Sequence, residues 1–114
     1  MTLLANIAEE HRGAVAIARI EGEIDASNVD WVGGRLHGLV SNQLETLIVD
    51  LSGTTYLDSA GIALLFRLAG ELREHQQRLR LVVADGSPIA RMVGLTGLRS
   101  SVPTHPALDD ALDD

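Results

Sequence analysis

The hydroxyl of Ser59 is the side chain in this sequence that is best placed for chemistry. It lies in the stretch Leu57-Asp58-Ser59-Ala60-Gly61-Ile62, which follows a short and nearly continuous apolar run, Leu47 to Leu51. Such a run is typical of a strand that is covered on both faces. Because open α/β sheets place functional groups at the carboxyl ends of their strands, the stretch predicts a hydroxyl presented where a helix begins. A second interpretation stays open, in which Asp58 or Ser59 only caps that helix and Gly61 allows tight packing.

A role for Ser59 as a catalytic nucleophile would need a general base within hydrogen-bond reach and an oxyanion hole. The Gly-x-Ser-x-Gly motif is absent, because Leu57 stands where its first glycine belongs. The histidines lie far apart and show no ligand-like spacing, so we expect them to be solvated surface residues: His11, His37, His75 and His105. The sequence therefore predicts no catalytic residue, and the protein is not expected to be an enzyme.

Composition excludes several other classes of protein. The net charge of −7 argues against direct binding of nucleic acid, whose affinity comes mostly from basic side chains. The absence of cysteine excludes a disulfide framework and thiolate metal sites, and we expect no metal. No glycine-rich phosphate loop is present, and there is no lysine to serve one, so no cofactor is expected. Without an eighteen-residue apolar run or a signal-peptide pattern, we expect a cytoplasmic protein with no direct membrane insertion.

The elements that position Ser59 alternate between strands and helices. Two strand-like runs joined by a hairpin connection at 11–13 come first, and a capping pattern at 27–30 then predicts a helix. Residues 52–57 are expected to form a loop, and Ser87-Pro88 to begin a helix. The order β-β-α-β-α-β-α-β-α predicts one α/β domain over residues 1–114. The predicted strands cover residues 3–9, 14–20, 47–51, 79–84 and 101–103, and residues 105–114 form an acidic, frayed C-terminal helix.

The predicted helix after Ser59 is apolar beyond a single stripe. Leu64 and Leu68 are apolar residues that lie outside the main apolar face of this helix. That face is formed by Ile62, Leu65, Phe66, Ala69 and Leu72. Two interpretations remain open for this wide apolar face. The helix is either packed on two sides, or it offers a partner surface that begins at Ser59 and has Arg67 at its rim.

Two motifs resemble those of the STAS domain family, especially its bacterial anti-sigma factor antagonists. They are Asp50-Leu51-Ser52 followed by Leu57 to Ile62, and Gly22-Glu23-Ile24-Asp25 about 33 residues before Ser59. The resemblance extends over nearly the whole chain and includes the Leu95-Thr96-Gly97-Leu98 segment. It implies a STAS-like domain with a mixed, mostly parallel sheet of four to five strands, an N-terminal β-hairpin and about four helices.

The resemblance also implies a function in transcription regulation by partner switching. An anti-sigma factor antagonist of this kind binds an anti-sigma factor with serine kinase activity, is switched off when its serine is phosphorylated, and is reset by a serine phosphatase. By position the phosphorylated residue is Ser59, whose phosphate we expect the free N–H groups and dipole of the helix N-terminus to favour. The implied partner-binding residues are Asp25, Asp58, Ser59, Ala60, Gly61, Ile62, Leu64, Arg67 and Leu68.

Other STAS proteins supply the alternatives. The pattern Ile62-Ala63-Leu64-Leu65 after the Asp-Ser motif is also similar to STAS-type small subunits of lipid-trafficking ABC transporters, in which phosphorylation need not matter. A stressosome-like scaffold module or a nucleotide-binding regulatory module would share the same fold. Many family members have Ser or Thr at the position of Ala60. Because this chain has alanine there, Ser59 is the one residue with a hydroxyl in the Asp58-Ser59-Ala60-Gly61 stretch.

Overall fold

Two antiparallel strands, β1 (Ala5–Arg12) and β2 (Val15–Ile24), open the computed structural model, which describes residues 4–113. The predicted N-terminal hairpin is confirmed, although both strands continue further than expected. The turn lies at Gly13 and Ala14, and β2 runs on through Gly22. Leu3, which the sequence places in the first strand, lies outside the described residues.

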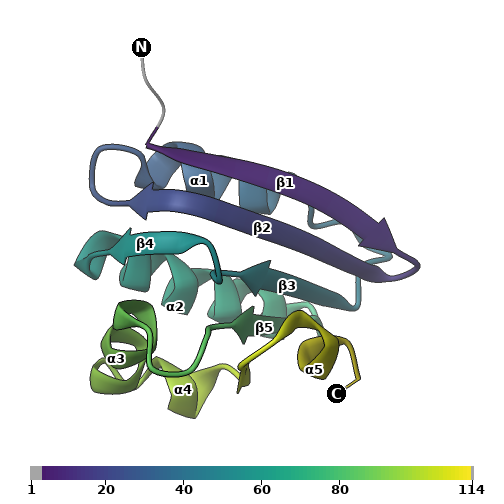
Figure 1. Ribbon diagram of the computed structural model, residues 1–114. Coiled ribbons are helices and arrows are strands. Elements are labelled where there is room, and N and C mark those ends of the chain that lie inside the picture. The colour runs from purple at the N-terminus through teal and green to yellow at the C-terminus, as the bar shows by residue number, and fades with distance from the viewer. Residues whose placement is uncertain (1–3, 114) are drawn as a thin grey trace.

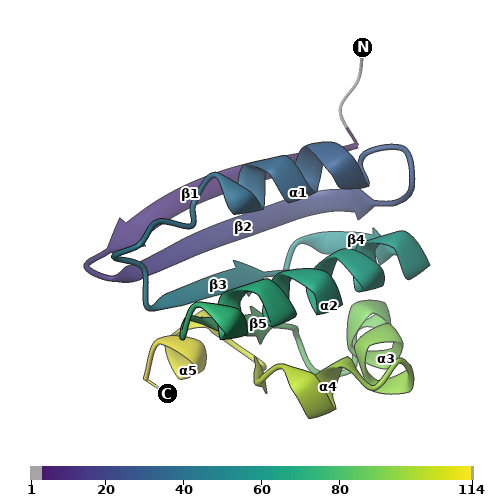
Figure 2. The same ribbon diagram turned by 180° about the vertical axis from the view of Figure 1, so that it is seen from behind.

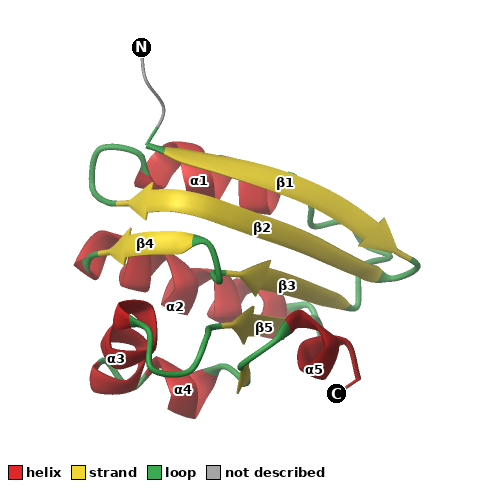
Figure 3. Ribbon diagram, viewed as in Figure 1, coloured by secondary structure: helices red, strands yellow, loops and turns green. Residues whose placement is uncertain are grey.

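Over residues 4–113 the sheet has six strands, one or two more than expected. Figure 3 shows the strands in yellow. Its order is β1-β2-β3-β5-β6, and β4 pairs with the end of β2. Every pair except β1 and β2 is parallel. The four further strands are β3 (Thr46–Asp50), β4 (Thr54–Leu57), β5 (Arg78–Val82) and β6 (Thr104–His105).

Two of these strands correct the sequence-based prediction. The loop expected over residues 52–57 contains β4, which pairs with β2 alone. Because β4 is only four residues long, its sequence shows too little of the strand period to predict a strand. The short edge strand predicted at 101–103 begins instead at Thr104, where β6 pairs with Leu81 and Val82 of β5.

Helices cover both faces of the sheet. In Figure 1, α1 (Val29–His37) and α2 (Ser59–Glu74) lie side by side behind the strands, and Figure 2 shows the same pair from the other side. The C-terminal half adds α3 (Pro88–Leu95) and the single turn α4 (Leu98–Ser101) near β5, and α5 (Leu108–Asp113) on the front face. Residues 4–113 therefore form five helices rather than about four. The predicted start of α3 is confirmed, since the Ser87 hydroxyl accepts a hydrogen bond from Ala90 N at 3.1 Å.

The main core lies between the sheet and the α1–α2 layer, and it is built from aliphatic side chains. Leu64 and Leu68 belong to it and are only 2% and 1% exposed, so the prediction that they line a partner surface is wrong. Helix α2 packs on two sides: a Cβ at Gly33 of α1 would lie 3.1 Å from Leu64 Cδ1. Phe66, which the periodicity places in the core, is exposed instead.

The acidic C-terminal helix is docked and not frayed over the residues that the structure describes. Ala111 is fully buried against Ile17, Ile48 and Val82 on the front face of the sheet. The Arg80 guanidinium donates to the Ala111 carbonyl at 3.0 Å. A cation at the C-terminal end of a helix satisfies orphan carbonyls and offsets the dipole that disfavours acidic residues there.

His37 joins the two helices that cover the core. Its Nε2 lies 2.6 Å from Glu71 Oε2 of α2, and its Nδ1 lies 2.8 Å from the Gly33 carbonyl. Both neighbours are acceptors, so only the doubly protonated ring can donate to both. The Glu71 carboxylate, and then the Gly33 carbonyl, raise the pKa of His37 above its usual value. His37 is thus exposed, as expected, but it is bonded to its neighbours as well as solvated.

This bridge predicts a pH-dependent term in stability. A group whose pKa is raised on folding contributes fully below its unfolded value of about 6.5, and that contribution is lost as the pH rises through the folded pKa. Replacing His37 with Gln should therefore lower the free energy of unfolding at pH 6 and leave it nearly unchanged at pH 9. Because both side chains are more than two-fifths exposed, the difference should not exceed about 1 kcal/mol.

Urea unfolding of wild type, His37→Gln and His11→Gln at the two pH values measures this term. His11 is exposed on β1, so its variant controls for the loss of a histidine as such. A penalty for His37→Gln that is equal at both pH values would show that the bridge contributes only through packing.

Candidate functional site

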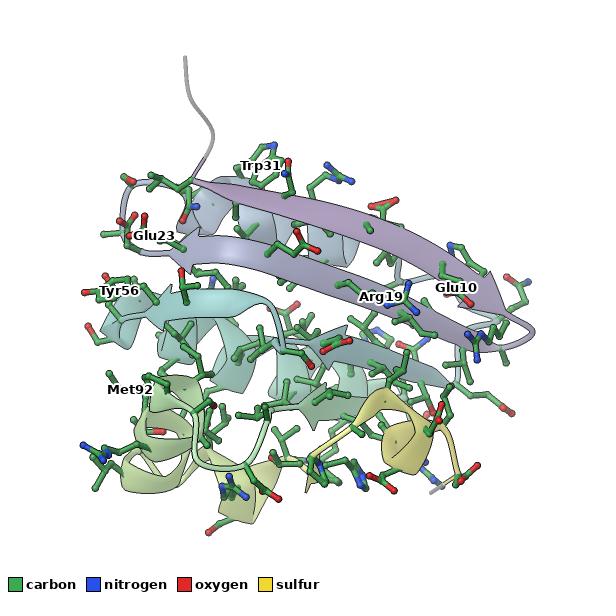
Figure 4. The ribbon with its side chains drawn as sticks, viewed as in Figure 1. Glu10, Arg19, Glu23, Trp31, Tyr56 and Met92 are labelled. Atoms are coloured by element: carbon green, nitrogen blue, oxygen red, sulfur yellow. The ribbon has the colours of Figure 1, made fainter. Side chains whose placement is uncertain are left out.

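The candidate site forms where β2 and β4 end side by side. The two parallel strands pair Ile24 with Leu57, and Asp58 N donates to the Ile24 carbonyl at 3.3 Å. Asp25 and Asp58 therefore follow equivalent positions on neighbouring strands. Figure 4 shows Glu23 and Tyr56, another register pair of these strands, at the same end of the sheet.

The register between β2 and β4 shifts at one point. Gly22 pairs with Thr54 and Glu23 pairs with Tyr56, so Thr55 of β4 is the extra residue. Gly22 has a φ of +106°, and a Cβ there would lie 2.2 Å from the Leu4 carbonyl oxygen, so no larger residue fits. The next residue, Glu23, donates its N–H to the same Leu4 carbonyl at 2.9 Å.

Asp58 is the N-cap of α2. Its Oδ1 accepts hydrogen bonds from Ala60 N at 2.9 Å and from Gly61 N at 3.2 Å. The helix-capping interpretation is therefore confirmed for Asp58, and Ser59 becomes the first residue of the helix. The expectation that the N-terminus of α2 has free N–H groups for a phosphate is corrected, because two of these donors already bond the Asp58 carboxylate.

Gly61 brings the first turn of α2 against the ends of both strands. A Cβ at this position would lie 2.3 Å from Leu57 Cδ1 and 3.1 Å from Ile24 Cγ2, and both of those side chains are 2% exposed. The close approach predicted for Gly61 is thus present. It fixes the depth at which the helix start, and with it Ser59, sits on the sheet.

Asp25 lies in the loop between β2 and α1, where neighbouring donors hold its carboxylate. Its Oδ1 accepts from the Ser27 hydroxyl at 2.6 Å and from Ser27 N at 2.8 Å. These bonds, the hydroxyl first, lower the pKa of Asp25 and keep the carboxylate charged. Ser27 was expected to cap α1. The helix begins after Asn28 without a side-chain cap, because the Asn28 amide bonds Asp25 N and the Glu23 carbonyl.

The hydroxyl of Ser59 is presented to solvent directly after the Asp58 cap. Ser59 is exposed, and its hydroxyl forms no hydrogen bond within residues 4–113. In the same part of the chain, Asp25 and Asp58 each direct Oδ1 to local donors, and no histidine bonds the hydroxyl. The arrangement offers an accessible acceptor oxygen in a negatively charged setting, with no activating base of its own.

The remaining predicted partner-binding residues divide by exposure. Arg67 is exposed on α2, and Ala60 is partly exposed, whereas Gly61 and Ile62 are buried beneath them. Leu64 and Leu68, as described above, belong to the core. The sequence reasoning missed Ala63 and Phe66, which continue the exposed stripe from Ser59 at helical spacing. The i, i+4, i+7 spacing from Ser59 could have predicted this stripe. It was missed because Phe66 was assigned to the core.

Within the described residues, no helix combines the length and the hydropathy that crossing a membrane requires. Residues 4–113 also contain no cluster of three or more acidic, histidine or cysteine side chains arranged to hold a metal ion.

Comparison with known proteins places these features in a family. A family model described as the STAS domain matches residues 6–111, which include both motifs. The anti-sigma-F factor antagonist RsfB of Mycobacterium tuberculosis is 32% identical over 104 residues, which cover 90% of this chain and 82% of that protein. The anti-sigma-F factor antagonist RsfA of the same organism is 29% identical over 105 residues, covering 90% and 81%. The crystal structure of an anti-sigma factor antagonist from Mycobacterium paratuberculosis has a TM-score of 0.86 at 27% identity, covering 96% and 92%.

The packing at Gly61 predicts a large difference between two glycine substitutions in one helix. Gly61→Ala forces Leu57 or Ile24 from a buried position, and such overpacking costs about 1–3 kcal/mol. Gly70→Ala is the matched control, because nothing lies within 4 Å of the added Cβ, and it should stabilise α2 by about 0.5–1 kcal/mol. Urea unfolding measures both. Equal stability of the two variants would contradict the close approach of α2 to the strand ends.

Proposed function

The chain belongs to the STAS domain family, and we propose that it is an anti-sigma factor antagonist regulated by phosphorylation of Ser59. Two curated relatives that match 90% of the chain are named anti-sigma-F factor antagonists, and a solved structure with a TM-score of 0.86 is that of an anti-sigma factor antagonist. The observation that carries the finer proposal is the exposed Ser59 hydroxyl at a helix start that Asp58 already caps. Regulators of this kind are not enzymes, and the role places the protein in the cytoplasm.

In the unphosphorylated state the protein binds an anti-sigma factor that has serine kinase activity, and so frees the sigma factor. The contact surface consists of the exposed residues of the first three turns of α2, which are Ser59, Ala63, Phe66 and Arg67. Aromatic and arginine side chains contribute most to such interfaces. Asp25 and Asp58 border this surface at the ends of β2 and β4.

The kinase reaction transfers the γ-phosphoryl group of ATP to Ser59. A bond forms between Ser59 Oγ and phosphorus, the bond to the departing ADP breaks, and the serine proton leaves to a base. The base comes from the kinase, since the hydrogen bonds from Ser27 lower the pKa of Asp25 and so make it a weaker proton acceptor, and Asp58 is engaged in the helix cap. A serine phosphatase later hydrolyses the ester and restores the hydroxyl.

Phosphorylation breaks the complex by local electrostatics. The phosphoryl group adds about −1.5 to −2 charges beside the carboxylates of Asp25 and Asp58. Because the Ala60 and Gly61 amides are already bonded to Asp58, the new group must extend outward into the partner surface. The complex is weakened where the partner presents apolar or acidic groups to this position, at a cost of several kcal/mol, which corresponds to a hundredfold or greater loss of affinity.

The similarity to transporter subunits has a structural explanation in this chain. It rests on Leu64 and Leu65 in the Ile62-Ala63-Leu64-Leu65 pattern, and both leucines are 2% exposed in the core. Their identity follows from packing α2 between α1 and the sheet. No feature of the described surface favours a transporter subunit over the switch.

The switch is tested by intact mass and by capture of partners from the native lysate. Wild-type protein should carry a phosphate that Ser59→Ala lacks. An anti-sigma factor of the serine kinase class should bind Ser59→Ala, and its binding to Ser59→Asp should be at least tenfold weaker because of the added charge. Ser100→Ala, which removes an exposed hydroxyl of α4, is the matched control and should still be phosphorylated.

Two results would contradict the proposal. Phosphate that persists in Ser59→Ala would place the modification elsewhere. The second result is that wild type, Ser59→Ala and Ser59→Asp all bind the same membrane-associated ATPase equally, with no phosphate detected. That result would mean that Ser59 only begins the helix, and it would support the transporter-subunit alternative.

A further inference from the structure

The outer side of β1 is a long edge of the sheet. This strand pairs with β2 alone and has eight residues, whereas β6 at the opposite edge has two. Among residues 4–113, no strand pairs with the outer side of β1. A long edge presents a row of backbone N–H and C=O groups, which is a template for pairing with another chain. The fold must therefore either use this edge or close it.

The hydrogen bonds of β2 show which backbone groups of β1 point outward. Gly22 is the register partner of Ala5, and it donates its N–H to the Gly53 carbonyl, away from β1. The direction of these groups alternates along an antiparallel pair, and the register of β1 and β2 has no shift. The odd-numbered residues of β1 therefore direct their N–H and C=O groups away from β2. Ile7 and Glu9 are the two at the middle of the edge.

Arg35 of α1 closes the middle of this edge. Its Nη2 donates to the outward Ile7 carbonyl at 3.3 Å, and its Nε and Nη2 donate to Glu9 Oε2 at 3.2 and 3.1 Å. Its Cζ also lies 5.5 Å from the centre of the Trp31 ring, within the range of a cation–π contact. Figure 4 shows Trp31 on the side of β1 that faces away from β2. One side chain thus occupies the acceptor that an added strand would need.

We propose that Arg35 is a latch that keeps β1 from pairing with β1 of a second copy of this chain. A second copy is the occupant because the edge complements itself in one antiparallel register. With the two-fold axis at Ala8, Glu9 of one copy faces Ile7 of the other, and no residue of β1 faces a like charge. In this register the Glu9 N–H of one copy donates to the Ile7 carbonyl of the other, which is the acceptor that Arg35 holds. The latch uses no residue of the proposed switch and is independent of it.

Sedimentation equilibrium of wild type and Arg35→Ala tests the latch. Arg35→Ala should dimerise at a protein concentration at least tenfold lower than wild type does, because the Ile7 carbonyl becomes free. The Arg35–Glu9 ion pair is exposed, so its loss should cost the fold little. Arg91→Ala removes an exposed arginine of α3 and the same charge, and this matched control should behave like wild type. Equal dimerisation of wild type and Arg35→Ala would overturn the proposal.

Two further measurements separate edge pairing from other kinds of association. Adding Glu9→Pro to Arg35→Ala removes the outward N–H that pairs with the second copy and no bond to β2, so it should restore the monomer. In Arg35→Ala itself, the Ile7 and Glu9 amides should become protected from hydrogen exchange as the protein concentration rises. A dimer that survives the proline, or that forms without this protection, would overturn the proposal. Dispersed amide spectra confirm that each variant is folded.

Discussion

The pairing of β2 with two successive parallel strands is the constraint on which the rest of this structure depends. After β3 the chain turns at residues 52–53 and returns to the end of the same strand as β4. The Gly22 amide donates to the Gly53 carbonyl at 3.0 Å, and the Thr54 hydroxyl donates to the Ile20 carbonyl at 2.8 Å. Because parallel strands end at a common edge, this pairing brings Asp25 to Asp58 across more than thirty residues of sequence.

The cap of α2 explains how Ser59 can be both exposed and well defined. Asp58 satisfies two backbone donors, so the helix start does not depend on the Ser59 side chain. Gly61 fixes how deeply that start sits on Leu57 and Ile24. The phosphorylation proposed for Ser59 would therefore change surface charge without removing a contact that the fold needs.

Helix α2 is fixed at several points along its length. Asp58 caps its N-terminus, and Gly61 brings its first turn against Leu57 and Ile24. Near its C-terminus, His37 holds the helix to α1 through Glu71, and Arg73 donates to the Ser101 carbonyl at 3.4 Å. The helix that begins at Ser59 is therefore anchored to elements from both halves of the chain.

The sequence alone determined the elements whose signals are local. The caps at Asp58 and Ser87, the buried run of β3 and the apolar periodicity of α2 predicted the alternation of strands and helices and placed Ser59 at a helix start. Tertiary structure decided what local patterns do not encode. Strand β4 exists because β2 offers an unpaired edge beyond β3, and Leu64 rather than Phe66 is buried because α1 presents Gly33 at that point. The last helix docks because Arg80 meets the Ala111 carbonyl. Each outcome depends on a contact between residues distant in sequence, and such contacts exist only after the chain has folded.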